Sequence, residues 1–134
     1  MIKSNDQTLQ PEGELMLQIP ACSEATNMFG DVYSGWVAAN IVKASEIYAA
    51  RQSQGRVSTV SIGEMTFMSP VLVGAVMSFY TQVLDKGNSS LRILVEVWSS
   101  SPDGVEQRKV TESECVQVAI DGHGHIRALD YLEK

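Results

Sequence analysis

Cysteine and long apolar runs are both scarce in this sequence. It contains two cysteines, Cys22 and Cys115, in 134 residues. The first residues, MIKSNDQTLQPEGE, are polar and lack the apolar centre of a signal peptide. We therefore expect two free thiols and a cytoplasmic location, since disulfides persist mainly in oxidising compartments. No apolar run approaches the roughly 18 residues of a membrane span, so we expect no membrane segment.

Positive charge is also scarce. Ten Lys and Arg face 16 Asp and Glu, which gives a formal net charge of −6, and the basic residues form no cluster. Nucleic-acid binding requires a basic stripe that neutralises phosphates, so this composition argues against a nucleic-acid partner. An anionic small molecule would need a site that gathers positive charge locally.

The sequence also lacks a set of metal ligands. Its two histidines, His123 and His125, fall in a Gly-His-Gly-His turn with no Cys or acidic ligand set beside them. We expect a surface turn there, no metal, and no resident cofactor.

What is present is an ordinary globular balance of 44% hydrophobic and 19% charged residues. The length suits one domain. We predict a flexible N-terminal arm over residues 1–13 and a single domain over residues 14–134.

Periodicity predicts one long helix and five strands. Residues 36–52, WVAANIVKASEIYAARQ, carry apolar side chains at helical spacing, with Ser34 as a plausible N-cap and Gly55 as the stop. Elsewhere apolar and polar residues alternate with a period of two, which is typical of strands. The predicted strands are 15–19, 56–67, 74–84, 90–99 and 107–121.

The faces of the last two strands follow from this alternation. Leu91, Ile93, Val95 and Val97 share one face of residues 90–99. In the last strand we expect two faces, one with Val110, Val116, Val118 and Ile120, the other with Lys109, Thr111 and Gln117.

The order of these elements predicts the fold. One strand, one long helix and four strands joined by short turns form a meander that twists and curls. The apolar helix must lie across its concave face, since nothing else can cover that face. This arrangement is typical of the hot-dog fold, of class α+β: a curled antiparallel sheet around one central helix.

Several short motifs carry a family resemblance. The main one is residues 26–36, TNMFGDVYSGW, at the helix start. Met-Thr-Phe at 65–67, Val-Glu-Val-Trp at 95–98 and Val-Ala-Ile-Asp at 118–121 follow in order. Together they resemble the YciA-like acyl-CoA thioesterases over about residues 15–129.

The resemblance implies hydrolysis of a fatty acyl thioester, with coenzyme A as part of the substrate. The thioester oxygen gains charge in the tetrahedral intermediate and needs hydrogen-bond donors. The backbone N–H groups of Ser34, Gly35 and Trp36 suit that role at the positive end of the helix dipole. Gly35 would let the substrate approach the backbone closely; alternatively, it only eases packing at the helix start.

The chain departs from the family pattern at the catalytic acid. The family places an Asp six residues after the Trp, where this chain has Val42, which can neither take a proton nor attack a carbonyl. The family also often carries an acidic residue in the strand after the helix, two residues before the Met of Met-Thr-Phe. This chain has Gly63 at that position, and its acidic residue, Glu64, comes one place later. A shift of one residue points Glu64 to the other face, unless a bulge at Gly63 restores it.

Three residues are candidates for the missing catalytic role. Asp31 matches the Gly-Asp of the family motif, or else orders the loop before the helix. Glu46 lies one turn beyond Val42 on the same helix face, about 6 Å along the axis, or else is solvated or ion-paired. Asn40 could hold a water molecule or the carbonyl.

The resemblance to the family is also weaker at the positions that would bind coenzyme A. Asn88 stands where the family often has a basic residue. The resemblance leaves a set of candidate residues for coenzyme A binding: Arg56, Ser89, Ser90 and Arg92.

Two functions remain open at this point. The first is an acyl-CoA thioesterase with a displaced acid. The second is a non-catalytic acyl or acyl-CoA binding protein that lost its catalytic Asp. In either case we expect a homodimer, or a trimer of dimers, with sites between subunits, because the monomer leaves a strand edge open.

Overall fold

The computed structural model describes residues 10–68 and 70–129. The predicted order of one strand, one long helix and four strands is confirmed, and so is the α+β hot-dog class. Most of the predicted arm lies outside the described residues, and the domain boundary stays a prediction. The elements are β1 (Glu14–Pro20), a short 3-10 helix η1 (Ser23–Ala25), α2 (Ser34–Ser53), β2 (Val57–Ile62), β3 (Val76–Lys86), β4 (Ser90–Ser100) and β5 (Gln107–Ala119).

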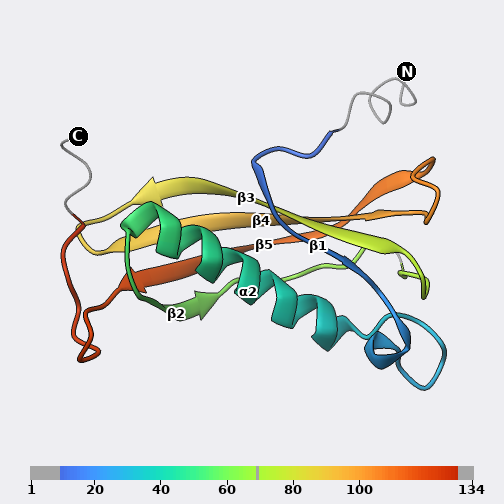
Figure 1. Ribbon diagram of the computed structural model, residues 1–134, viewed down its shortest axis with the longest axis horizontal. Coiled ribbons are helices and arrows are strands. Elements are labelled where there is room, and N and C mark those ends of the chain that lie inside the picture. Colours follow the sequence, from blue (N-terminus) through green and yellow to red (C-terminus); the bar gives the residue numbers. More distant parts are fainter. Residues whose placement is uncertain (1–9, 69, 130–134) are drawn as a thin grey trace.

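The strands form one antiparallel sheet in the order β1-β3-β4-β5-β2. Helix α2 lies across one face of this sheet, and β2 forms an edge beside it (Figure 1). The predicted inward face of β4 is confirmed, since Leu91, Ile93, Val95 and Val97 are buried. They pack against apolar residues of α2 such as Ile41. Among the described residues, no helix is long and apolar enough to cross a membrane.

The helix ends differ from the prediction in detail. Ser34 is the first helical residue and the N-cap is Tyr33, and no side chain among the described residues caps the start. At the other end, Gln54 rather than Gly55 adopts the left-handed conformation, with φ of 57°. The N–H of Gly55 then donates to the Ala50 carbonyl at 3.1 Å and completes a C-terminal turn.

The side chain of Arg127 also caps the C-terminal end of α2. The Arg127 guanidinium donates to the Ser53 carbonyl and hydroxyl, both at 3.1 Å, and to the carbonyls of Ile120 at 2.9 Å and Arg56 at 3.3 Å. One side chain therefore joins the helix end, the start of β2 and the segment after β5.

The predicted faces of the last strand are confirmed for Thr111 and Gln117 against Val116 and Val118. They are wrong at Lys109 and Val110, because β5 contains an extra residue there. Val97 pairs with Thr111 and Trp98 with Lys109, so Val110 is the extra residue between them. The bulge moves Lys109 to the face opposite Thr111. Beyond it, Thr111, Ser113, Cys115 and Gln117 are buried beneath the helix, whereas Val116 and Val118 are half-buried on the other face.

Strand β2 is shorter than predicted. The ladder with β5 ends at Ile62, and residues 63–67 continue without regular strand pairing. Its register shifts between Thr59 and Ser61. Met65 and Phe67 still pack against the core, so the extended segment keeps an inner and an outer side.

Candidate functional site

The loop before α2 is shaped by one asparagine. Asn27 Oδ1 accepts the backbone N–H groups of Phe29 at 2.9 Å and Asp31 at 3.1 Å, while Asn27 N–H donates to the Asp31 carbonyl at 2.8 Å. The loop is tied to a neighbouring segment because Val32 N–H donates to the Val71 carbonyl at 2.9 Å. The loop therefore presents the first turn of α2 in a fixed position.

The first turn of α2 carries unused hydrogen-bond donors. The N–H of Trp36 donates to the Tyr33 carbonyl at 3.0 Å, so it is already engaged. The N–H groups of Ser34 and Gly35 have no acceptor within the described part of the chain. Of the three predicted donors, two are thus available to a ligand.

Gly35 is covered by a side chain of its own loop. A Cβ at this position would lie 2.8 Å from the Tyr33 ring. This supports the packing explanation for the glycine. The Tyr33 side chain is 56% exposed, however, so it has room to move when a ligand approaches.

A cavity of about 360 Å³, lined mainly by residues with apolar side chains, lies beside the helix start. Its volume is in the range of small-molecule sites. Its lining combines the first turn of α2 with the segment that the loop contacts: Val32, Ser34, Val37, Phe67, Met68, Pro70 and Val71.

The position of the family acid is apolar and partly buried. Val42 is half-buried, and its carbonyl accepts the Ser45 hydroxyl at 2.9 Å. No side-chain proton acceptor is contributed at this position. A general base for hydrolysis would have to come from another residue.

A partly buried polar network lies one turn further along α2. Glu46 Oε2 is 2.6 Å from Thr59 Oγ1, and Thr59 Oγ1 is 3.0 Å from Gln117 Oε1. Gln117 Nε2 donates to Ser45 Oγ at 2.7 Å. Gln117 is fully buried, so its amide must be hydrogen-bonded inside the protein. The network joins α2, β2 and β5 near the open edge of the sheet.

The buried thiol of Cys115 belongs to the same region. Burial raises the pKa of Cys115, partly offset by hydrogen bonds with Ser45 and Ser113. Cys22 is exposed, and both cysteines are free, as predicted.

The other two candidate residues are placed less favourably. Asp31 is half-buried at a backbone bridge to Leu72. Asn40 is 4% exposed, and its Nδ2 donates to the Trp36 carbonyl of its own helix at 2.9 Å. Of the three candidates, only Glu46 has its side-chain group bound to another element.

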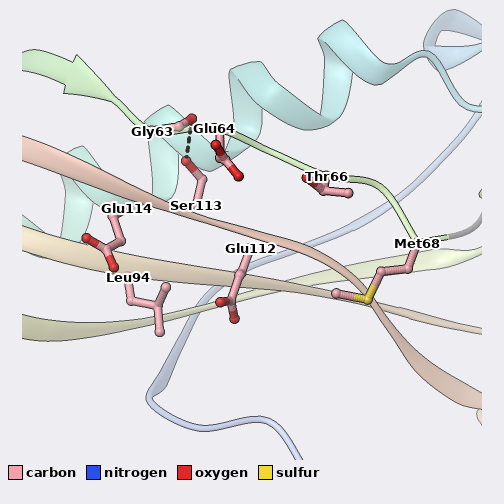
Figure 2. A pocket seen from close by; sticks show the side chains of 8 residues that line it. All are labelled: Gly63, Glu64, Thr66, Met68, Leu94, Glu112, Ser113 and Glu114. Carbon is pink, nitrogen blue, oxygen red and sulfur yellow. Dashed lines mark hydrogen bonds between the residues drawn. The ribbon is translucent and has the colours of Figure 1, made fainter.

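Glu64 lies on the outer face of the sheet, away from the helix. It lines a cavity of about 440 Å³ with Glu112 and Glu114, and Figure 2 shows the three carboxylates around it. The alternative of a bulge at Gly63 is wrong, because the register shift lies earlier and the Gly63 N–H donates to the Glu114 carbonyl at 2.8 Å. Ser113 Oγ holds the Gly63 carbonyl at 3.0 Å.

The predicted coenzyme A residues are far from the helix start within one chain. Arg56 lies beyond the C-terminal end of α2, where its Nη1 is 3.4 Å from the carbonyls of Asp121 and Gly122. Ser89 and Ser90 are at the same end, since the Ser89 carbonyl accepts Ala119 N–H at 2.8 Å. The 20 residues of α2 span about 30 Å, so one chain does not bring these groups to Ser34.

Arg92 is engaged on the outer face. It pairs with Glu114 at 3.0 Å and Asp85 at 3.8 Å. A role in coenzyme A binding would therefore compete with these acids.

The histidine turn is exposed, as predicted. Asp121 Oδ1 accepts the N–H groups of His125 at 2.9 Å and His123 at 2.8 Å, and these bonds lower the pKa of Asp121. Within the described part of the chain, no group of His, Cys, Asp and Glu could hold a metal ion.

Sequence reasoning missed Ser45, Thr59 and Gln117. A glutamine among the valines of the last strand is a signal that could have indicated this network, because a buried amide requires hydrogen-bond partners. Alternation places Gln117 on the same face as Thr111, as observed, but does not show that this face lies beneath the helix.

Comparison with known proteins places these features in context. Residues 29–106 match the thioesterase superfamily. The acyl-CoA thioester hydrolase YciA of Escherichia coli (strain K12) is 38% identical over 123 residues, covering 89% of this chain and 92% of that protein.

Solved structures agree with the sequence match. A hexameric thioesterase from Yersinia pestis superposes with a TM-score of 0.84 at 36% identity, covering 90% of this chain and 98% of that one. A hexameric hot-dog thioesterase of Campylobacter jejuni gives a TM-score of 0.81 at 30% identity, covering 88% and 91%.

Proposed function

This chain belongs to the thioesterase superfamily, and we propose from that membership that it hydrolyses acyl-CoA thioesters to a fatty acid and free coenzyme A. The observation that carries the proposal is the similarity to an acyl-CoA thioester hydrolase along nearly the whole fold. The helix start supports it, because donors and a cavity lined mainly by apolar side chains lie side by side there.

The free N–H groups of Ser34 and Gly35 would receive the thioester oxygen. The tetrahedral intermediate places negative charge on that oxygen, and prealigned backbone donors stabilise it without reorganisation. The positive end of the α2 dipole adds to this effect. Tyr33 would have to swing from Gly35 when the thioester binds.

A second copy of the chain would complete the site. Ser34 and Glu46 are twelve residues apart on one helix, about 18 Å along its axis. One chain therefore cannot bring both to a single thioester. In the described sheet, β2 is an edge strand with one side unpaired. Antiparallel pairing of two such edges would bring the helix start of one copy towards Thr59 and Glu46 of the other.

The same pairing would bring Arg56, Ser89 and Ser90 of one copy towards the helix start of the other. This supports coenzyme A binding across subunits by those residues, with Arg92 more remote on the outer face. We propose a homo-oligomer built from dimers, in keeping with hexameric relatives. The cytoplasmic location stays a proposal from composition.

One observation favours a second candidate function. Val42 removes the acid at the family position. If Asp31, Asn40 and Glu46 all fail to replace it, the protein would be a non-catalytic acyl-CoA binding protein that retains the cavity.

The test is hydrolysis of acyl-CoA thioesters of short to long chain by the pure protein. Turnover of at least one thioester, with free coenzyme A and fatty acid in equal amounts, is the expected result. Tight binding of acyl-CoA without turnover would instead support the binding protein. Neither turnover nor binding with any chain length would overturn both.

A further inference from the structure

We infer that Glu46 is the catalytic base and that Gln117 is a positioning residue that acts on it through Thr59. The inference rests on the proposed thioester hydrolysis and names the residues that perform it. It follows from the hydrogen bonds around Thr59 rather than from the position of Glu46 on the helix alone.

Glu46 has one bound and one free carboxylate oxygen. Its Oε2 is 2.6 Å from Thr59 Oγ1, within the range of a hydrogen bond between a hydroxyl and a carboxylate. Its Oε1 has no hydrogen-bond partner in the described part of the chain. The side chain is half-buried beside the open sheet edge. It is thus fixed by one oxygen and available to a water molecule through the other.

The Thr59 hydroxyl has one proton and two neighbouring oxygens. Besides Glu46 Oε2, it lies 3.0 Å from Gln117 Oε1. When Glu46 is a carboxylic acid, it donates to Thr59, and Thr59 donates to Gln117 Oε1. Gln117 Nε2 then donates to Ser45 Oγ at 2.7 Å, and Ser45 donates to the Val42 carbonyl at 2.9 Å. Each of these four hydrogen bonds then has one donor and one acceptor.

The ionised form of Glu46 is satisfied when the Gln117 amide and the Ser45 hydroxyl both turn. Thr59 then donates to Glu46, and Gln117 exchanges the places of its oxygen and nitrogen so that Nε2 donates to Thr59. The Ser45 hydroxyl turns to donate to Gln117 Oε1. The network therefore supports Glu46 both with and without a proton, which a base needs because it gains and returns a proton in each cycle.

Glu46 Oε1 takes a proton from water as the water oxygen forms a bond to the thioester carbonyl carbon. The tetrahedral intermediate then breaks its carbon–sulfur bond, and the thiolate receives the proton from Glu46. Fatty acid and the free thiol of coenzyme A leave, and Glu46 returns to its ionised form.

The experiment measures kcat and KM of the full-length protein on an acyl-CoA that wild type hydrolyses. Glu46→Gln should lower kcat by about 10²–10⁴-fold with KM unchanged. The matched control is Glu64→Gln, the same substitution on the outer face, which should keep wild-type kcat. Thermal unfolding of each variant verifies that it is folded.

The positioning role has its own readouts. Thr59→Val and Gln117→Met should each lower kcat about tenfold, the cost of one hydrogen bond, while Thr59→Ser restores it. Gln117→Met added to Glu46→Gln should cause no further loss, because Gln117 acts through Glu46. A multiplicative loss in the double variant would overturn the positioning role.

Two outcomes separate this inference from the proposed function. Wild-type kcat in Glu46→Gln, on a substrate that the wild type hydrolyses, overturns Glu46 as the base and leaves thioester hydrolysis standing. No hydrolysis of any thioester by the wild type overturns both.

Discussion

Restoring the family acid at Val42 should create a repulsive pair with Glu46. Both positions are half-buried on one side of α2, separated by four residues or about 6 Å along the helix axis. Two carboxylates at that distance repel by about 0.7 kcal/mol in water and about 2.8 kcal/mol at an effective dielectric constant near 20. Val42→Asp also gives up about 1 kcal/mol of partial apolar burial. We expect a total loss of about 2–4 kcal/mol in the free energy of unfolding.

A double-mutant cycle with Glu46→Gln isolates the repulsion. The four proteins are unfolded in urea at pH 7 and at one protein concentration, because oligomer stability depends on concentration. Val42→Asp should cost about 0.7–2.8 kcal/mol less when residue 46 is glutamine. Losses that add within about 0.3 kcal/mol would show that the two side chains do not repel each other, since distant and independent sites behave that way.

The same variants separate the two functions. With Glu46 as the base, Val42→Asp should not raise kcat, because the new carboxylate duplicates a group already present. A large gain in Val42→Asp that is insensitive to Glu46→Gln would instead mean that the wild type lacks a base and is a binding protein.

Three further predictions follow from local geometry. Arg127→Met removes four hydrogen bonds at the helix end. It should therefore lower the free energy of unfolding, measured in urea, by about 2–4 kcal/mol. A loss under about 0.5 kcal/mol would contradict this expectation. Cys115 should be alkylated far more slowly than Cys22 at pH 8, because burial raises its pKa and leaves less thiolate; equal rates in the folded protein would argue against it. Gly63→Ala should cost about 1–3 kcal/mol in urea unfolding, since its Cβ would lie 2.9 Å from a β5 carbonyl oxygen. Gly122→Ala, with open space around the new methyl group, is the control and should be silent.

The architecture was predictable because its signals are local. Alternation in β4 and helical spacing around Ile41 each indicate which side chains are buried, and the order of elements then limits the topology. The helix start was predictable for the same reason, since its residues are contiguous in sequence.

The Glu46 network was not predictable, because it depends on register. Gln117 faces the helix because β5 pairs with β4 in the register that sets Gln117 opposite Leu91, and a one-residue change in that register would reverse its face. The partner of Glu46 is likewise decided by how β2 pairs with β5. These are long-range alignments that no local pattern encodes.

The sheet order has a consequence for how the chain folds during synthesis. Strand β2 is made before β3, β4 and β5, yet its only ladder partner in the described sheet is β5. Strand β2 therefore stays unpaired until the residues beyond Gln107 have been synthesised. Strands β3 and β4 can form a hairpin before that. Non-local pairing of this kind is slow and leaves apolar strand surface exposed to other chains. The strand that contributes Thr59 is therefore among the last to join the sheet, and the hydrogen bonds around Glu46 form only when the sheet is complete.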